Sequence, residues 1–131
     1  MNRIETHFQQ AAAAKRKSLI LILTAGYPDL PTTEKIIRAV AEAGCDVLEL
    51  GVPFSDPIAD GPTIQKADIR ALAAGITPAM ALRFVREITE YKPVPIGLLV
   101  YYNLVVQYGT EQFFKDFKEA KAVSKGMPHL P

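Results

Sequence analysis

Two acidic residues stand close together in the chain, and their types and spacing suit acid–base chemistry. Glu49 interrupts residues 46–52, which otherwise read as a short buried apolar strand. Burying an isolated carboxylate costs several kcal/mol or more, so Glu49 must find a partner, face a cavity or take up a proton. A buried glutamate held in the core by a basic residue or by backbone N–H groups is the structural alternative.

The second acid, Asp60, lies on the loop that follows this strand. It precedes Gly61-Pro62, a pair of residues that is typical of a helix start. As an isolated Asp-Gly-Pro, Asp60 would be an N-cap or an Asx-turn residue. One acid in a strand and another at its carboxyl end is, however, the arrangement by which α/β folds bring two acid–base groups over one pocket.

The stretch that holds both acids resembles a known family. Residues 49–65 read Glu-Leu-Gly-Val-Pro-Phe-Ser-Asp-Pro-Ile-Ala-Asp-Gly-Pro-Thr-Ile-Gln, which closely resembles the signature of the tryptophan synthase alpha subunit family. Residues 23–29 and 95–103 are similar to the family's first strand and loop and to its third strand. The resemblance extends to about residue 120 and implies an α/β fold, the (β/α)8 TIM barrel.

The resemblance also implies an activity. Members of this family cleave indole-3-glycerol phosphate to indole and glyceraldehyde 3-phosphate, and the indole passes to a separate beta subunit that carries pyridoxal phosphate. Glu49 would protonate C3 of the indole and take the proton of the glycerol hydroxyl, because a barrel interior raises the pKa of a carboxyl group. Asp60 would stabilise the indole N–H. This chain itself would need no cofactor and no metal ion.

Further site residues follow from the same resemblance. Leu99 and Ala59 are expected to line the indole pocket, although a core leucine is the alternative at Leu99. Ile22 stands at a first-strand position where the family usually has an aromatic ring, so it is expected to line a looser pocket. Asp56 and Asn103 are expected on the face that contacts the beta subunit.

Hydrophobic periodicity predicts the elements that must position these residues. The basic cluster 15–17 is interpreted as a solvated end of the first helix that complements its dipole. The predicted order is a capping helix over 2–16, a strand over 19–23, a helix over 31–43, the strand over 46–52, helices over 63–74 and from residue 77, a strand over 96–101, and a helix over 110–121.

The chain departs from its family in length. A complete barrel has about 250 residues and eight strands, whereas this sequence has 131 residues. We therefore expect the N-terminal portion of one TIM-barrel domain, a capping helix and about three βα units, without the later glycine-rich loops that bind phosphate. Residues 121–131 contain no apolar run suited to a strand, and we interpret this tail as a product of truncation or deletion rather than a new element.

Composition limits the partners. With 49% hydrophobic residues, 22% charged residues and a net charge of +1, the chain is typical of a soluble globular protein and shows no bias towards nucleic acid or membranes. A single cysteine, Cys45, fits a reducing compartment and a role as a small buried hydrophobe. No signal peptide or membrane-spanning run is apparent. A cytoplasmic location is expected.

Three interpretations remain open from the sequence. The first is the alpha-subunit lyase. The second is an inactive half barrel that acts as an assembly module or binds the beta subunit without turnover. The third is a non-functional truncated gene product. In every case the isolated chain is expected to associate and not to catalyse the cleavage, because strands built for burial on both faces would lack an opposing wall.

Overall fold

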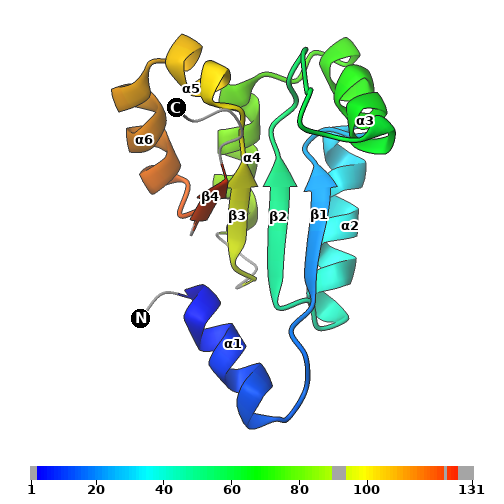
Figure 1. Ribbon diagram of the computed structural model, residues 1–131, viewed down its shortest axis with the longest axis vertical. Coiled ribbons are helices and arrows are strands. Elements are labelled where there is room, and N and C mark those ends of the chain that lie inside the picture. Colours follow the sequence, from blue (N-terminus) through cyan, green and yellow to red (C-terminus); the bar gives the residue numbers. More distant parts are fainter. Residues whose placement is uncertain (1–2, 90–93, 123, 127–131) are drawn as a thin grey trace.

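The computed structural model describes residues 3–89, 94–122 and 124–126, with only the backbone described in the last segment. Its centre is a parallel sheet of four strands in the order β1-β2-β3-β4. Figure 1 shows the strand arrows pointing the same way. The strands are β1 (Ile20–Thr24), β2 (Val47–Gly51), β3 (Ile96–Leu99) and β4 (Ser124–Gly126).

Helices connect and cover the strands. They are α1 (Arg3–Ala13), α2 (Leu30–Glu42), α3 (Pro62–Ala73), α4 (Pro78–Thr89), α5 (Tyr102–Tyr108) and α6 (Thr110–Glu119). In Figure 1, α1 lies beyond the starting ends of the strands, whereas α5 and the loop from β2 to α3 lie at their carboxyl ends. The carboxyl ends of β2 and β3 therefore share one edge with the acidic loop.

The helices pack against one face of the sheet. Side chains alternate between the two faces of a strand, and Leu48, Leu50 and Leu98 belong to a buried core cluster. That cluster also contains Ile37 of α2 and Phe113 of α6. The apolar stripes of these helices thus face the sheet.

The other face of the sheet is open in this chain. Ile20 and Ile22 are 49% and 45% exposed, and Glu49 is exposed as well. As expected, strand side chains on this face lack an opposing wall in the described residues. Strand periodicity identifies apolar side chains but does not say what covers them.

Two elements differ from the predicted ones. The tail contributes a strand, since Ser124–Gly126 pairs in parallel with β3. The interpretation that residues 121–131 form no new element is therefore wrong at these three positions. The remaining tail residues 127–131 lie outside the described part. Helix α5 was not predicted. The other boundaries agree with the predicted ones to within a few residues.

Arg16 also has a different role from the predicted one. It lies beyond the end of α1, and its guanidinium donates to both oxygens of the buried Asp46, at 2.9 and 2.7 Å. The backbone N–H of Leu19 donates a third bond to Asp46, of 2.7 Å. Arg16 therefore holds the start of β2 against the segment that leads into β1.

Candidate active site

Asp60 is held in place by a residue of the next strand unit. It lies half-buried on the loop after β2, and the Tyr101 hydroxyl donates a 2.9 Å hydrogen bond to its Oδ2. The backbone N–H of Ala59 donates to the same hydroxyl oxygen at 3.1 Å. The Phe54 ring stacks on the Tyr101 ring with a centroid distance of 4.8 Å and an interplanar angle of 26°. The loop and the end of β3 thus form one unit.

Gln65 fixes the same loop from the first turn of α3. Its Nε2 donates to the carbonyl oxygens of Pro57 and Asp60, at 3.2 and 2.9 Å. The N-cap of α3 is Gly61, which makes no side-chain capping bond, and Pro62 opens the helix. Asp60 is therefore not the N-cap, and its carboxylate points to Tyr101 instead.

Burial keeps the Tyr101 hydroxyl protonated. Tyr101 is buried, and this burial, together with its hydrogen bond to Asp60, raises its pKa to about 12. The hydroxyl group is thus a hydrogen-bond donor throughout the neutral range. Because it occupies Oδ2 of Asp60, Oδ1 is available for a donor on a bound molecule.

Asp60 and Tyr101 belong to a small hollow at the carboxyl ends of the strands. The hollow is lined by Ile22 of β1, Leu99 of β3 and Asp60, and by Thr24, Gly51, Tyr101, Ile64 and Asp68 among others. The structure therefore brings together three of the predicted site residues. The hollow combines apolar side chains with the carboxyl groups of Asp60 and Asp68.

Glu49 lies outside this hollow but on the open face of the same sheet. Its Cα atom is in register with those of Ile22 and Gly97 on the neighbouring strands. Its side chain is exposed, so the described residues do not enclose it in a barrel interior. The reason is that nothing in the described residues covers that face. Gly97 has no side chain, which leaves space beside Glu49.

The remaining predicted residues lie on the surface. Ala59 is exposed, and its backbone rather than its methyl group makes the contact with Tyr101. Asp56 is exposed and accepts a 3.0 Å hydrogen bond from the Ser55 hydroxyl. Asn103 is exposed in α5. Asp56 and Asn103 therefore belong to elements at the carboxyl end of the sheet.

Asp68 is a site residue that the sequence analysis missed. It is 3% exposed and lines the hollow. Burial raises its pKa to about 6, the backbone N–H of Phe54 has a smaller, opposite effect, and the charge of Asp60 raises the pKa further. Its position was a readable signal, because Asp68 stands one helical turn after Ile64, within the apolar stripe of α3.

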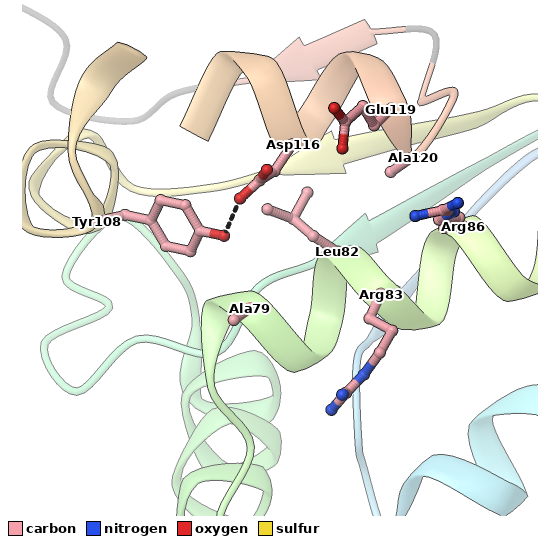
Figure 2. A pocket seen from close by; sticks show the side chains of 8 residues that line it. All are labelled: Ala79, Leu82, Arg83, Arg86, Tyr108, Asp116, Glu119 and Ala120. Atoms are coloured by element: carbon pink, nitrogen blue, oxygen red, sulfur yellow. Dashed lines mark hydrogen bonds between the residues drawn. The ribbon is translucent and has the colours of Figure 1, made fainter. Parts of the chain in front are cut away.

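A second, larger cavity lies among the covering helices. It has a volume of about 220 Å³ and is lined by residues of α4, α5 and α6. Figure 2 shows the Tyr108 hydroxyl pointing to Asp116, to which it hydrogen-bonds, while Arg83 points away from both. None of the predicted site residues lines it, and it combines two arginines with two carboxylates.

Within residues 3–89, 94–122 and 124–126 there is no group of three histidine, cysteine or acidic residues that could hold a metal ion. In the same part of the chain, no helix has the length and apolar character needed to cross a membrane.

Comparisons with known proteins agree on one family. The family model described as tryptophan synthase alpha chain matches residues 8–131. The tryptophan synthase alpha chain of Caldanaerobacter subterraneus is 47% identical over 131 residues, which is 100% of this chain and 50% of that protein. That of Desulfosudis oleivorans is 48% identical, over 100% of this chain and 49% of that protein.

Solved structures give the same result for the fold. The alpha subunit of tryptophan synthase from Legionella pneumophila matches with a TM-score of 0.94 and 39% identity, over 100% of this chain and 50% of that one. A chain of tryptophan synthase from M. tuberculosis matches with a TM-score of 0.91 and 35% identity, over 99% of this chain and 53% of that one. The chain spans about half the length of the relatives it matches. Its four-stranded sheet is accordingly part of a TIM barrel.

Proposed function

Because the chain belongs to the tryptophan synthase alpha chain family, we propose that it supplies the catalytic wall of a carbon–carbon lyase. The reaction is the cleavage of indole-3-glycerol phosphate to indole and glyceraldehyde 3-phosphate, a step of tryptophan biosynthesis. The observation that carries the proposal is the position of Asp60. Its carboxylate is fixed by Tyr101 at the rim of a hollow that Ile22 and Leu99 line.

The reaction needs two proton transfers and the stabilisation of a developing charge, and the two carboxylates Glu49 and Asp60 divide these roles. C3 of the indole must gain a proton and the glycerol hydroxyl must lose one, and Glu49 performs both steps. Asp60 accepts the indole N–H through Oδ1, because Tyr101 already occupies Oδ2. A carboxylate fixed before the charge develops stabilises a transition state without reorganisation.

The apolar residues orient the indole ring. Leu99 and Ile22 come from two strands that flank β2, so a flat ring laid on this face lies over the strand of Glu49. Ile22 is smaller than an aromatic residue and leaves a wider pocket. Ala59 lies next to Asp60, and its backbone N–H fixes the Tyr101 hydroxyl. Positioning of this kind lowers the entropic part of a barrier.

The partner in this proposal is a tryptophan synthase beta subunit, which holds pyridoxal phosphate and receives the indole. The alpha chain needs no cofactor of its own for proton transfer by two carboxylates. Asp56 and Asn103 are exposed at the carboxyl end of the sheet and would contact the beta subunit. The proposed location of the complex is the cytoplasm.

The test is a hybrid protein that joins residues 1–126 of this chain to the second half of a full-length relative. Indole release from indole-3-glycerol phosphate is measured for the hybrid and its Glu49→Gln variant. We expect an active hybrid and a loss of about 10²-fold or more in the variant, since general acid–base groups typically contribute 10²–10⁴-fold. Glu87→Gln, at an exposed position of α4, is the matched control and should keep full activity.

The same experiment separates the lyase from a module that binds without turnover. A folded hybrid that binds the beta subunit but releases no indole would favour the binding module. Retention of more than about a tenth of the activity in Glu49→Gln would reject the role of Glu49 as the acid–base group.

A further inference from the structure

Gly26 and Ile76 touch just beyond the ends of β1 and α3. The backbone of Gly26 has a φ of +84°, and a Cβ atom added there would lie 2.3 Å from Cγ1 and 2.7 Å from Cδ1 of Ile76. Real Cβ atoms essentially never come within 3.0 Å of a non-bonded heavy atom, and Ile76 is buried. A side chain at position 26 would therefore push Ile76 away from β1.

Ile76 is fixed to the end of α3. Its backbone N–H donates to the carbonyl oxygen of Ala71 at 3.2 Å, and the N–H of Gly75 donates to the carbonyl oxygen of Leu72 at 2.9 Å. This pair of hydrogen bonds is the Schellman motif, which ends many helices. Ile76 is also β-branched, so its χ1 angle is stiff and its side chain has few ways to turn aside. Ile76 therefore moves together with α3.

Gly26 is fixed to the end of β1 in a similar way. The N–H of the preceding Ala25 donates to the carbonyl oxygen of Gly51 at 2.9 Å, which continues the pairing of β1 with β2. The N–H of Gly26 itself donates to the hydroxyl oxygen of the buried Thr33 in α2, at 3.2 Å. Neither partner of the contact can therefore move without the element that carries it.

The two elements that this contact joins are also walls of the candidate site. The hollow is lined by Ile22 and Thr24 of β1 and by Ile64 of α3, among others, so its width depends on the distance between β1 and α3. Asp60 comes shortly before Pro62, the residue that begins α3. A shift of α3 would therefore move Asp60 as well as one wall of the hollow.

We propose that Gly26 is a positioning residue: its lack of a side chain lets Ile76 approach the end of β1, and this contact sets the place of α3, the width of the hollow and the position of Asp60. The contact itself is a property of the fold. Its effect on indole release rests on the proposed function, and a misplacement of about 1 Å can cost about 10²-fold in rate.

The test uses the hybrid protein rather than the isolated chain, which is expected to associate. Gly26→Ala should lower kcat for indole release by about tenfold or more, because it displaces α3 and with it Asp60. Gly44→Ala is the matched control: Gly44 has a φ of +102°, but a Cβ atom added there would have no atom within 4 Å. It introduces a similar backbone strain without the contact, so it should keep the parent kcat.

A second substitution at position 76 separates the contact from general damage. Ile76→Ala removes Cγ1 and Cδ1 and leaves only Cβ, which would lie 3.4 Å from the added Cβ atom, an ordinary contact distance. Ile76→Val keeps Cγ1, the atom that would lie nearest. Gly26→Ala combined with Ile76→Ala should therefore recover the kcat of Ile76→Ala alone, whereas the combination with Ile76→Val should not recover the kcat of Ile76→Val.

Crystal structures of the hybrid and of its Gly26→Ala variant test the geometry without an activity measurement. The variant should show α3 further from β1, and the hydrogen bond from Tyr101 to Asp60, 2.9 Å in the parent chain, should be longer or broken. If α3 and this bond stayed in place, the proposal would be wrong. A parent hybrid that releases no indole would instead contradict the proposed function, and the crystal structures would still decide whether the contact positions α3.

Three kinetic results would also overturn the proposal: an equal kcat in Gly26→Ala and Gly44→Ala, no recovery with Ile76→Ala, or an equal recovery with Ile76→Val. If Gly26→Ala alone does not fold, as judged by circular dichroism, the two combinations decide by their thermal melting. A cooperative melt that returns with Ile76→Ala and not with Ile76→Val would support the contact as the cause. A melt that returns with both, or with neither, would overturn it.

Discussion

The hydroxyl group of Tyr101 donates a 2.9 Å hydrogen bond to Oδ2 of Asp60, across 41 positions of the chain. The two residues follow neighbouring parallel strands, β3 and β2, so the fold brings them together at the carboxyl edge of the sheet. This bond orients the Asp60 carboxylate towards a hollow with apolar walls. Four predictions concern this pair, the open face of the sheet and the Arg16–Asp46 ion pair.

Asp60 should act through its charge. The cap of α3 is Gly61, so Asp60→Asn should leave the melting temperature of the hybrid nearly unchanged. Indole release should fall by about 10²-fold, because a neutral amide stabilises a developing positive charge poorly. Melting by circular dichroism and an indole assay measure the two effects. If Asp60→Asn kept full turnover while Asp60→Ala merely melted earlier, the role assigned to the charge would be wrong.

Tyr101→Phe should destabilise the chain by about 1–3 kcal/mol, since it removes a hydrogen bond to a charged group and the acceptor for the Ala59 N–H. Tyr102→Phe, half-buried at the next position, is the matched control and should cost less. Urea unfolding gives both values.

The pH dependence of this loss follows from the pKa of Tyr101, which is raised to about 12. The contribution of Tyr101 to stability is therefore complete below the ordinary tyrosine pKa of about 10. The difference should therefore be constant between pH 6 and 9, and a difference that varied within that range would contradict the assignment.

Arg16→Met should destabilise the chain in a pH-dependent way. Hydrogen bonds from Arg16 and from the Leu19 N–H lower the pKa of Asp46 to about 2 from its ordinary 3.8. A lowered carboxyl pKa contributes stability above the unfolded value, and that contribution is lost as pH falls from about 4 towards 2. The variant should be clearly less stable than the parent chain at pH 7, where the buried carboxylate of Asp46 loses its partner, and should differ much less from it at pH 2.

Lys17→Met is the control for Arg16→Met, because Lys17 is equally close to the strand and exposed. Its unfolding free energy should change little at either pH. Equal losses in both variants, or a loss in Arg16→Met that stayed the same at pH 2 and pH 7, would show that the Arg16–Asp46 pair is not the cause.

The isolated chain should associate and should not release indole. Its open sheet face exposes Ile20 and Ile22, 49% and 45%, and apolar surface of this kind favours association. Glu49 is exposed on that face, so a substrate bound beside it would not be shielded from water. Light scattering after size exclusion and an indole assay test both points. A monomer with measurable indole release would contradict the prediction.

The sequence by itself determined the first three strands and most of the helices. The apolar run of β2 and the apolar stripe of α4 are local patterns, because each follows from the side-chain period of a single strand or helix. The irregular loop from Glu49 to Gln65 was distinctive enough to indicate the family, which the comparisons confirmed. Pro62 at the start of α3 and Thr77 at the start of α4, whose hydroxyl accepts from the Met80 N–H, were also readable.

The tertiary structure alone decided which distant groups meet. The short strand β4 forms by backbone pairing with β3. The side chains of three residues do not indicate such pairing. The partner of Asp60 is Tyr101 rather than its own helix, and the partner of Arg16 is Asp46 rather than a helix dipole. Asp68 lies in an apolar stripe, but only the fold places it in one hollow with Asp60 and Tyr101. Contacts of this kind depend on how whole elements pack, and no periodicity within one element encodes them.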